Sequence, residues 1–588
     1  MRQFRLTALV LALASVGSAV NLRETTAQSD TSDLRRALRS SALEYERSLR
    51  RLAPYRMGGT PRECNEIVGR FCLYYDAGPE PALPAEPEGI GKARTRAIES
   101  FSAALDIGAA DTMIALPLVR YLIEGGRHAD AVAVARRFAQ ASADSMWASL
   151  LLGFALHAAD STQAAQRAFQ HVLARMRPSE GEDWRDVRYL LAPAERPRYR
   201  ELRGDARVQY ENHLWRLADP LYLTVGNESL TEHFARQVYA RILMRAPLVQ
   251  GGVSWGEDLD ELTQRFGVPK ARTQDNSRSL ELHITEHYDH GQLTYVPPEV
   301  HSNDGITLFE PGAAWPYDTI RARNGYAPAT VRRMRVLEHQ ISRFPLGDST
   351  LVRADLRVPM DSAVRLPARV ELGLFLLDSA FQVVHQVWDT IDAVRDTVVG
   401  VLSLALPEAA VAYSLEAREL GTRLSARARY LLPLPLLSRP VLSDLVMLDA
   451  PDFGAPAIRS SPAFRPLSTL RIPRNEPVAI YLEARGLMAN DERQVRYRVD
   501  LEVIEQNRPG AVGRAVRRLG RALGLGGDAV APRITWTEQA QSAGFVPIAL
   551  KLGELRLDPG LKRFRVTVTD LDSGLSGSVE RVVRIDRR

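Results

Sequence analysis

Two short patterns in the sequence carry residue types that can do chemistry. His283, Glu286 and His287 form H-x-x-E-H, in which two histidines hold a zinc ion and the glutamate activates its bound water. That chemistry needs a helix, because residues four apart on a strand lie about 13 Å from one another. The residues around His283 alternate between polar and apolar, which predicts a strand and hairpin histidines. A zinc hydrolase is kept as an alternative, and so is a surface metal site that includes His290 or His301.

The second pattern is G-x-S-x-G, formed by Gly252, Ser254 and Gly256. In hydrolases this pattern is a sharp turn that follows a buried strand and exposes a nucleophilic serine. Here a predicted helix ends shortly before the pattern and leaves only Leu248 and Val249 as strand. Ser254 as a nucleophile is therefore a second alternative. The sequence has no phosphate-binding glycine loop and no full dinucleotide motif, and we expect no cofactor.

The first residues predict export. Arg2 and Arg5 precede an apolar run and then small residues, which is the arrangement of a secretory signal peptide. Cleavage after Ala19 or after Ala27 fits the pattern. We therefore expect a periplasmic or extracellular protein with no membrane-spanning helix.

Cys64 and Cys72 are the only cysteines of the chain. In an exported protein they predict one local disulfide, closed by a turn because eight residues of helix would hold them about 12 Å apart.

The positive charge comes almost entirely from arginines spread along the chain, which argues against nucleic-acid binding. One basic cluster stands out, because its arginines interleave with apolar residues: Arg514, Arg517, Arg518 and Arg521. This segment predicts either an amphipathic helix that contacts an anionic membrane or a partner, or a solvated loop.

The region from Lys92 to Pro178 contains a repeat. Ala97, Ala131 and Ala165 are spaced by 34 residues, and leucines recur at the same interval. This period resembles tetratricopeptide (TPR) repeats, which are helix pairs whose concave face binds peptides. We expect about two and a half units, with two later helices covering the end of the array. Candidate partner contacts on these helices are Arg120, Tyr121, Trp147 and His157.

After Pro269 the apolar period changes to two. Alternating stripes such as Val370–Leu376, Tyr497–Val503 and Phe564–Val568 predict two β-sandwiches of the immunoglobulin-like kind, separated by the proline-rich stretch Asp449–Pro466.

The segment Tyr210–Pro269 joins the helical and β-rich halves. Its features are Trp215, Asp219-Pro220, Asn227-Glu228, a second helix, Trp255-Gly256-x-Asp258 and Gly267-x-Pro269. In this order they resemble the GWxTD-domain proteins of bacteria, although Ser254 and Glu257 replace the glycine and threonine of the motif. The resemblance implies an exported protein with no defined reaction.

The residues themselves predict a structural role for the motif. Asp258 and Glu261 have the spacing of a capping box, with Trp255 packed beneath it, and Gly267 and Pro269 end the helix.

The sequence therefore predicts a multidomain α plus β protein that acts as a non-enzymatic scaffold or binding protein in the cell envelope. The expected parts are a signal peptide (1–27), an N-terminal helix with the cysteine loop (33–90), TPR-like repeats (91–178), a helical connector (179–250), a GWxTD-like α/β segment (251–335) and two β-sandwiches (336–450 and 466–588). The expected partner is a protein or peptide. Weak contact with a membrane surface is the further alternative.

Overall fold

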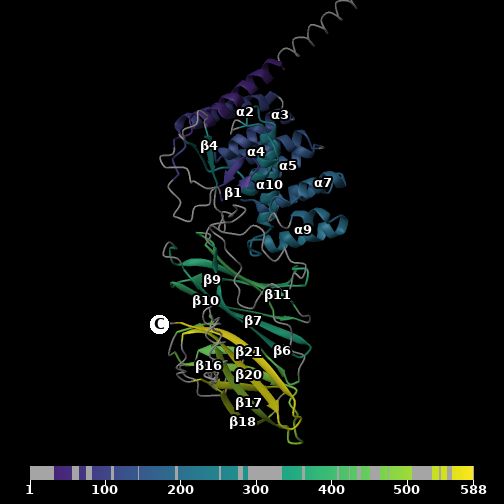
Figure 1. The fold of residues 1–588 in the computed structure, drawn as a ribbon, viewed down its shortest axis with the longest axis vertical. Helices are drawn as coiled ribbons and strands as arrows, with labels where there is room; N and C mark the ends of the chain where they lie inside the picture. The colour runs from purple at the N-terminus through teal and green to yellow at the C-terminus, as the bar shows by residue number, and fades with distance from the viewer. Residues whose placement is uncertain are drawn as a thin grey trace, which may run out of the picture. The chain divides into compact units, whose positions relative to one another are not determined.

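The protein is described from a computed structural model. The described residues are 32–55, 65–73, 83–107, 111–143, 145–191, 196–249, 253–275, 283–288, 334–360, 364–406, 410–422, 424–432, 439–449, 464–473, 476–505, 533–541, 544–552 and 559–586. They form two compact units, one made of the helices with strands β1–β4 and one made of β5–β21, to which Leu221–Leu223 also belong. Helices thus dominate the N-terminal half and sheets the C-terminal half, which confirms the mixed α plus β class (Figure 1).

Five consecutive helices of the first unit pack in chain order. They are α2 (Glu88–Ile107), α3 (Thr112–Glu124), α4 (His128–Ala141), α5 (Met146–Ala158) and α6 (Thr162–Leu173). The bounds of α5 follow those of α3 at the 34-residue interval predicted from the alanines, and Ala97, Ala131 and Ala165 are fully buried. The turns repeat as well, because Gly126 and Asp160 both have positive φ, 70° and 55°.

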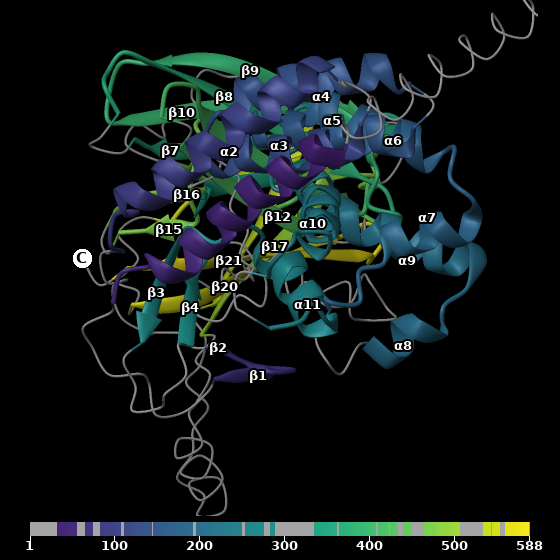
Figure 2. The same ribbon diagram turned by 90° about the horizontal axis from the view of Figure 1, so that it is seen from above.

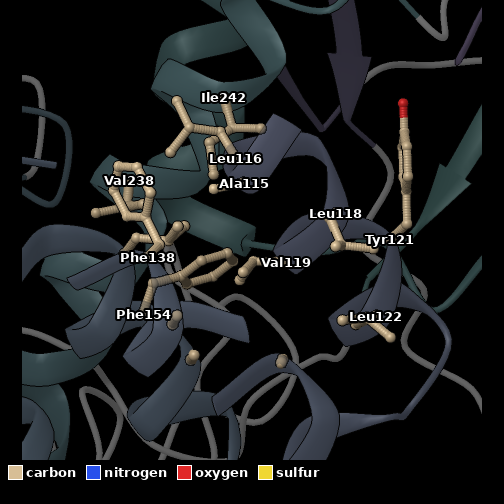
Figure 3. Packing of buried hydrophobic residues seen from close by; sticks show 14 of the residues in the cluster. Ala115, Leu116, Leu118, Val119, Tyr121, Leu122, Phe138, Phe154, Val238 and Ile242 are labelled. Atoms are coloured by element: carbon tan, nitrogen blue, oxygen red, sulfur yellow. The ribbon is translucent and has the colours of Figure 1, made fainter. Parts of the chain in front are cut away.

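The later helices continue along this array. They are α7 (Pro178–Arg185), α8 (Arg196–Glu201), α9 (Gly204–Ala218), α10 (Glu228–Met244) and α11 (Glu257–Phe266). Helix α10 packs against α3, α5 and α6, and Figures 2 and 3 show it beside the array. Val238 and Ile242 of α10 share one apolar core with Leu116 of α3 and Phe154 of α5 (Figure 3). Helix α10 thus covers the last two helices of the array, α5 and α6, as expected, and it also reaches α3.

An N-terminal helix, residues 32–51, joins the same core through Leu38, Tyr45 and Leu49. Two hairpins complete the unit. Strands β1 (Glu66–Val68) and β2 (Phe71–Leu73) pair with each other, and β3 (Ala271–Asp275) pairs with β4 (His283–His287). Among the helices that the structure describes, none is both long and apolar enough to cross a membrane.

The second unit begins with two sheets that enclose one core. The described strands of the first sheet lie in the order β10 (Thr397–Leu406), β7 (Ser349–Pro359) and β6 (Glu338–Leu346). Those of the second sheet lie in the order β5 (Met334–Val336), β12 (Ser425–Leu431), β11 (Ala412–Glu419), β8 (Ala368–Leu377) and β9 (Val383–Ala393). The stripe that includes Val370, Leu372, Leu374 and Leu376 is buried in this core, as its alternation predicts.

A second pair of sheets encloses another core. One sheet contains β13 (Val441–Leu442), β16 (Val478–Arg485), β14 (Val446–Asp449) and β19 (Val546–Lys551). The other contains β15 (Arg471–Ile472), β21 (Ser576–Ile585), β20 (Gly560–Asp570), β17 (Gln494–Glu505) and β18 (Arg533–Gln541). The stripes in Tyr497–Val503 and Phe564–Val568 point into this core, which confirms their predicted buried faces.

Candidate functional site

The motif turn Trp255–Asp258 is held by the β1–β2 hairpin. Asp258 accepts two side-chain hydrogen bonds from Arg70, from Nε at 2.6 Å and from Nη2 at 2.7 Å. Arg70 also donates from its backbone nitrogen to Asp258 and from Nη2 to the carbonyl of Ser254. This bidentate geometry is the strong form of an arginine–carboxylate contact, so it fixes the turn against the hairpin.

The hairpin approaches the motif closely because the first residue of its turn, Gly69, carries no side chain. Gly69 has a φ of 52°, and a Cβ atom there would lie 2.5 Å from Cβ of Asp258. Next to this contact, Val68 packs with Leu262 and Phe266 of α11 in a small apolar cluster. A glycine is therefore required at position 69 both by the backbone conformation and by the space.

Asp258 does not form the predicted capping box. The N-cap residue of α11 is Gly256, and no side chain caps the helix there. The pKa of Asp258 is lowered to about 2, mainly by the side-chain hydrogen bonds from Arg70. An anion so tightly paired is a poor general base, so the contact supports a structural role for this motif residue.

Glu261, the other half of the expected box, belongs to an ion-pair chain instead. It accepts hydrogen bonds from Arg196 at 2.5 Å and from Arg265 at 3.3 Å. Arg265 is fully buried and also makes two 2.9 Å contacts with Glu66 of β1. The chain of contacts joins α8, α11 and the hairpin, and its pairs with Arg196 and Glu66 connect residues that are distant in the sequence.

The end of α11 needs the motif glycine. Gly267 has a φ of 72°, and a Cβ atom at this position would lie 3.0 Å from Nε of Arg236. Arg236 in turn donates to the carbonyl oxygens of Gln264 and Arg265, which are among the last carbonyls of α11. Gly267 thus ends the helix as predicted, and Pro269 follows in a half-buried position.

The other half of the motif segment forms a joint between α9 and α10. The Asn227 side chain accepts from the Leu230 nitrogen at 2.9 Å and donates to the Trp215 carbonyl at 2.6 Å. The ring of Trp215 packs against the fully buried His233 at a tilt of 40°, with ring centroids 5.0 Å apart. Burial lowers the pKa of His233 to about 3, so this histidine is neutral at physiological pH. The contacts between α9 and α10 are therefore a helix cap at Asn227 and aromatic packing of Trp215 and His233.

The contacts of the described residues do not assemble either catalytic alternative. Ser254 is exposed and its hydroxyl lies 3.5 Å from Nη1 of Arg70, while Gly252 lies outside the described residues. His283, Glu286 and His287 lie on strand β4, which confirms the strand prediction and opposes shared metal ligation by the two histidines.

The side chains of β4 contact residues of the same hairpin. Glu286 pairs with Arg272 at 3.1 Å and accepts a hydrogen bond from Tyr288 at 2.5 Å. His287 Nε2 lies 2.8 Å from the hydroxyl oxygen of Thr273. Among the described residues, no group of three histidine, cysteine or acidic side chains could hold a metal ion. The side chain of His283 is not among those described, and His290 and His301 lie outside the described residues.

The face of the helical array that could bind a peptide is covered by the chain itself. Arg120 and Tyr121 are each 1% exposed and Trp147 is 9% exposed. His157 approaches two residues of α10, Thr231 at 3.0 Å and Glu232 at 2.5 Å. The expectation that these four residues contact a partner is therefore wrong, because the N-terminal helix and α10 bury or engage them.

A buried ionic network lies beneath the N-terminal helix, and the sequence patterns gave no sign of it. Arg120 donates to Glu46 at 2.6 Å and to Glu124 at 2.8 Å. Tyr45 and Tyr239 donate to Glu124 at 2.7 and 2.8 Å. Burial raises the pKa of Glu46, whereas Arg120 keeps the pKa of Glu124 low against the larger opposing effect of burial. The network ties α3, α10 and the N-terminal helix together.

Two further sets of predicted site residues are not placed by the structure. Cys72 lies half-buried on β2, whereas Cys64 lies outside the described residues. The basic cluster Arg514, Arg517, Arg518 and Arg521 also lies outside them. The disulfide and the membrane or partner contact remain predictions.

The most exposed aromatic side chain among the described residues lies in the second unit. Strand β9 is at the edge of its sheet and, among the described strands, pairs only with β8. Trp388 on β9 is 61% exposed, and Val384 is 46% exposed. The neighbouring edge strand β10 exposes Val399 and Val401 at 61% and 49%. An edge strand with exposed large apolar residues is a template for pairing with another chain.

Comparison with known proteins gives no relative from which a function can be taken. No family model and no curated protein matches the sequence. Among solved structures, red sea bream transglutaminase aligns at 13% identity over 57% of this chain and 44% of that chain, with a TM-score of 0.13. The chain thus spans less than half of the transglutaminase, and a likeness this weak carries no argument about fold or function.

Proposed function

We propose that the chain is a non-enzymatic scaffold or binding protein of the cell envelope, exported by residues 1–27. In this proposal the helices are TPR-like repeats, the two-sheet modules are immunoglobulin-like β-sandwiches, and the partner is a protein that presents an extended segment. The observation that carries the proposal is the exposed edge strand β9 with Trp388 61% exposed.

The partner contact is assigned to the sheets because the helical array is already occupied. Helix α10 lies against α3, α5 and α6, so the repeat helices bind a segment of the same chain. Among the described strands β9 pairs only with β8, so its other edge offers backbone donors and acceptors along Val383–Ala393. An extended segment that adds to such an edge gains main-chain hydrogen bonds, and an exposed tryptophan supplies an anchor.

The test is a position-specific crosslink in the full-length protein. Trp388 is replaced by a photoreactive phenylalanine analogue, and the matched control carries the analogue at Thr537, which is exposed on the edge strand β18. We expect a discrete crosslinked protein in native envelopes from position 388 only. Trp388→Ala should then lower the affinity of the isolated partner roughly 30-fold, as expected for a hot-spot tryptophan worth about 2 kcal/mol. Equal crosslinking from both positions, or none from position 388, contradicts the proposal.

A further inference from the structure

The outer face of the five-stranded sheet carries charged side chains that are shielded from water. On this face, opposite to the apolar core, lie Ser414 and Glu416 of β11 and Arg427 and Arg429 of β12. Their exposures are 0%, 0%, 4% and 2%. The outer face of an antiparallel sheet is ordinarily solvated, so a covering segment with matching polar groups is required here.

Leu221–Leu223, which belong to the same compact unit, contact this face through a backbone amide. Glu416 accepts a hydrogen bond from the backbone nitrogen of Leu223 at 2.9 Å. The other carboxylate oxygen accepts from Ser414 at 2.8 Å and from Arg429 at 3.2 Å. Ser414 and Arg429 of the sheet therefore orient the Glu416 carboxylate towards the backbone nitrogen of Leu223. A carboxylate that binds a backbone amide in this way can also bind the main chain of a separate peptide.

Two side-chain slots lie beside this carboxylate. The ring of Tyr222 lies 4.1 Å from the guanidinium carbon of Arg429 and 5.5 Å, edge to face, from the ring of Phe375. Leu223 lies over Gly373, where an added Cβ atom would be 2.9 Å from its Cδ2 atom. The first slot thus fits an aromatic ring by cation–π and edge contacts, and the second fits an aliphatic side chain.

We propose that this face is a binding site for a short peptide turn with an adjacent aromatic–aliphatic pair, and that the chain's own Tyr222–Leu223 occupies it. The contacts are those of a three-residue segment, so its occupancy in the intact chain depends on covalent linkage, which supplies a millimolar effective concentration. Once vacated, the same site takes the segment from solution. Trp388 is the cross-strand neighbour of Gly373 and borders the site, but the site does not depend on a partner at the free edge of β9.

The test uses the full-length protein with Tyr222→Ser and Leu223→Ser, called the emptied variant, which removes both side chains from the site and leaves the residues of the sheet unchanged. A fluorescent peptide spanning residues 218–226 (ADPLYLTVG) is titrated into this variant and into the wild type, with anisotropy as the readout. We expect the emptied variant to bind the peptide at least tenfold more tightly than the wild type. A control peptide with serine in place of the tyrosine and the second leucine should bind neither protein.

A third variant tests whether the peptide binds at this site. Glu416→Ala in the emptied variant should weaken the peptide at least tenfold while the circular dichroism spectrum stays unchanged. If the double variant does not fold, Leu223→Ala provides the partly emptied site. Equal binding by wild type and emptied variant, or no binding by a folded emptied variant, overturns the proposal. A concentration-dependent dimer that the emptied variant loses would overturn the assignment to the chain's own segment and place the segment of a second copy in the site.

Discussion

Replacing Arg120 by methionine tests how strongly the buried ionic network holds the N-terminal helix. The side chains of Arg120, Glu46 and Glu124 are 1%, 0% and 5% exposed. The substitution leaves two carboxylates buried close together without the guanidinium that pairs with both. Breaking a buried ion pair from one side costs about 3–5 kcal/mol, and for a unit of this size each kcal/mol corresponds to roughly 2–4 °C. We expect the free energy of unfolding to fall by about 4 kcal/mol. The midpoint temperature of the unfolding of the helical unit should fall by roughly 8–16 °C.

The matched control uses an ion pair of nearly the same length whose glutamate lies on the same N-terminal helix. Arg96 pairs with Glu44 at 2.5 Å, close to the 2.6 Å of Arg120 and Glu46, but these side chains are 53% and 56% exposed. Arg96→Met should therefore cost less than about 1 kcal/mol. Both variants are unfolded with urea and followed by circular dichroism at 222 nm. A loss of under 1 kcal/mol for Arg120→Met, or equal losses for both variants, refutes the reasoning.

The pH dependence adds an independent check. Burial already raises the pKa of Glu46 in the wild type, and loss of Arg120 raises it further. A carboxyl whose folded pKa is raised destabilises the fold only when it is ionised, that is, as pH rises through the folded pKa. The stability difference between Arg120→Met and wild type should therefore shrink as pH falls from 7 towards 4. A difference that grows on acidification would contradict the assignment.

Three further results are expected. Asp258→Asn should speed trypsin cleavage after Arg70, because it weakens the bidentate contact, whereas Glu257→Gln on the same turn should leave peptide-map rates unchanged. The pKa of His233 lies near 3, so its burial makes stability fall by up to about 1.4 kcal/mol per pH unit below roughly 6.5; His233→Gln should flatten that slope in urea titrations at several pH values. Finally, peptide mapping without reductant should recover Cys64 and Cys72 in one disulfide-linked fragment, and two free thiols would exclude it.

Local patterns predicted the elements of this protein well. The 34-residue spacing of alanines placed the repeating helices, and Gly126 and Asp160 fall at the turns between them. The alternation around Val370–Leu376 identified a strand and its buried face. The strand at His283–His287 followed from the same reasoning. These features depend on period and turn chemistry, which a chain carries within a few residues of each position.

The pairings of charged groups could not be predicted in this way. Arg70 and Asp258 meet across 188 residues, so their spacing in the chain holds no trace of the contact. The capping box failed because α11 begins at Glu257 with Gly256 as its N-cap residue. Asp258 therefore lies inside the helix, where its carboxylate accepts hydrogen bonds from Arg70 as well as from the Leu259 amide. The contact of α10 with α3 was not predicted either, since an amphipathic helix shows an apolar face but not the full surface that it covers.

Glu44 and Glu46 show most directly what the sequence determined and what the tertiary structure determined. Both are glutamates on one helix, and both pair with an arginine at nearly the same distance, yet one side chain is 56% exposed and the other fully buried. By itself the sequence determined the helices, the strands and their apolar faces, because these follow from local periodicity. Only the tertiary structure decided which charges are buried, which surfaces are covered and which edge stays open, because each depends on the meeting of segments that are distant in the chain.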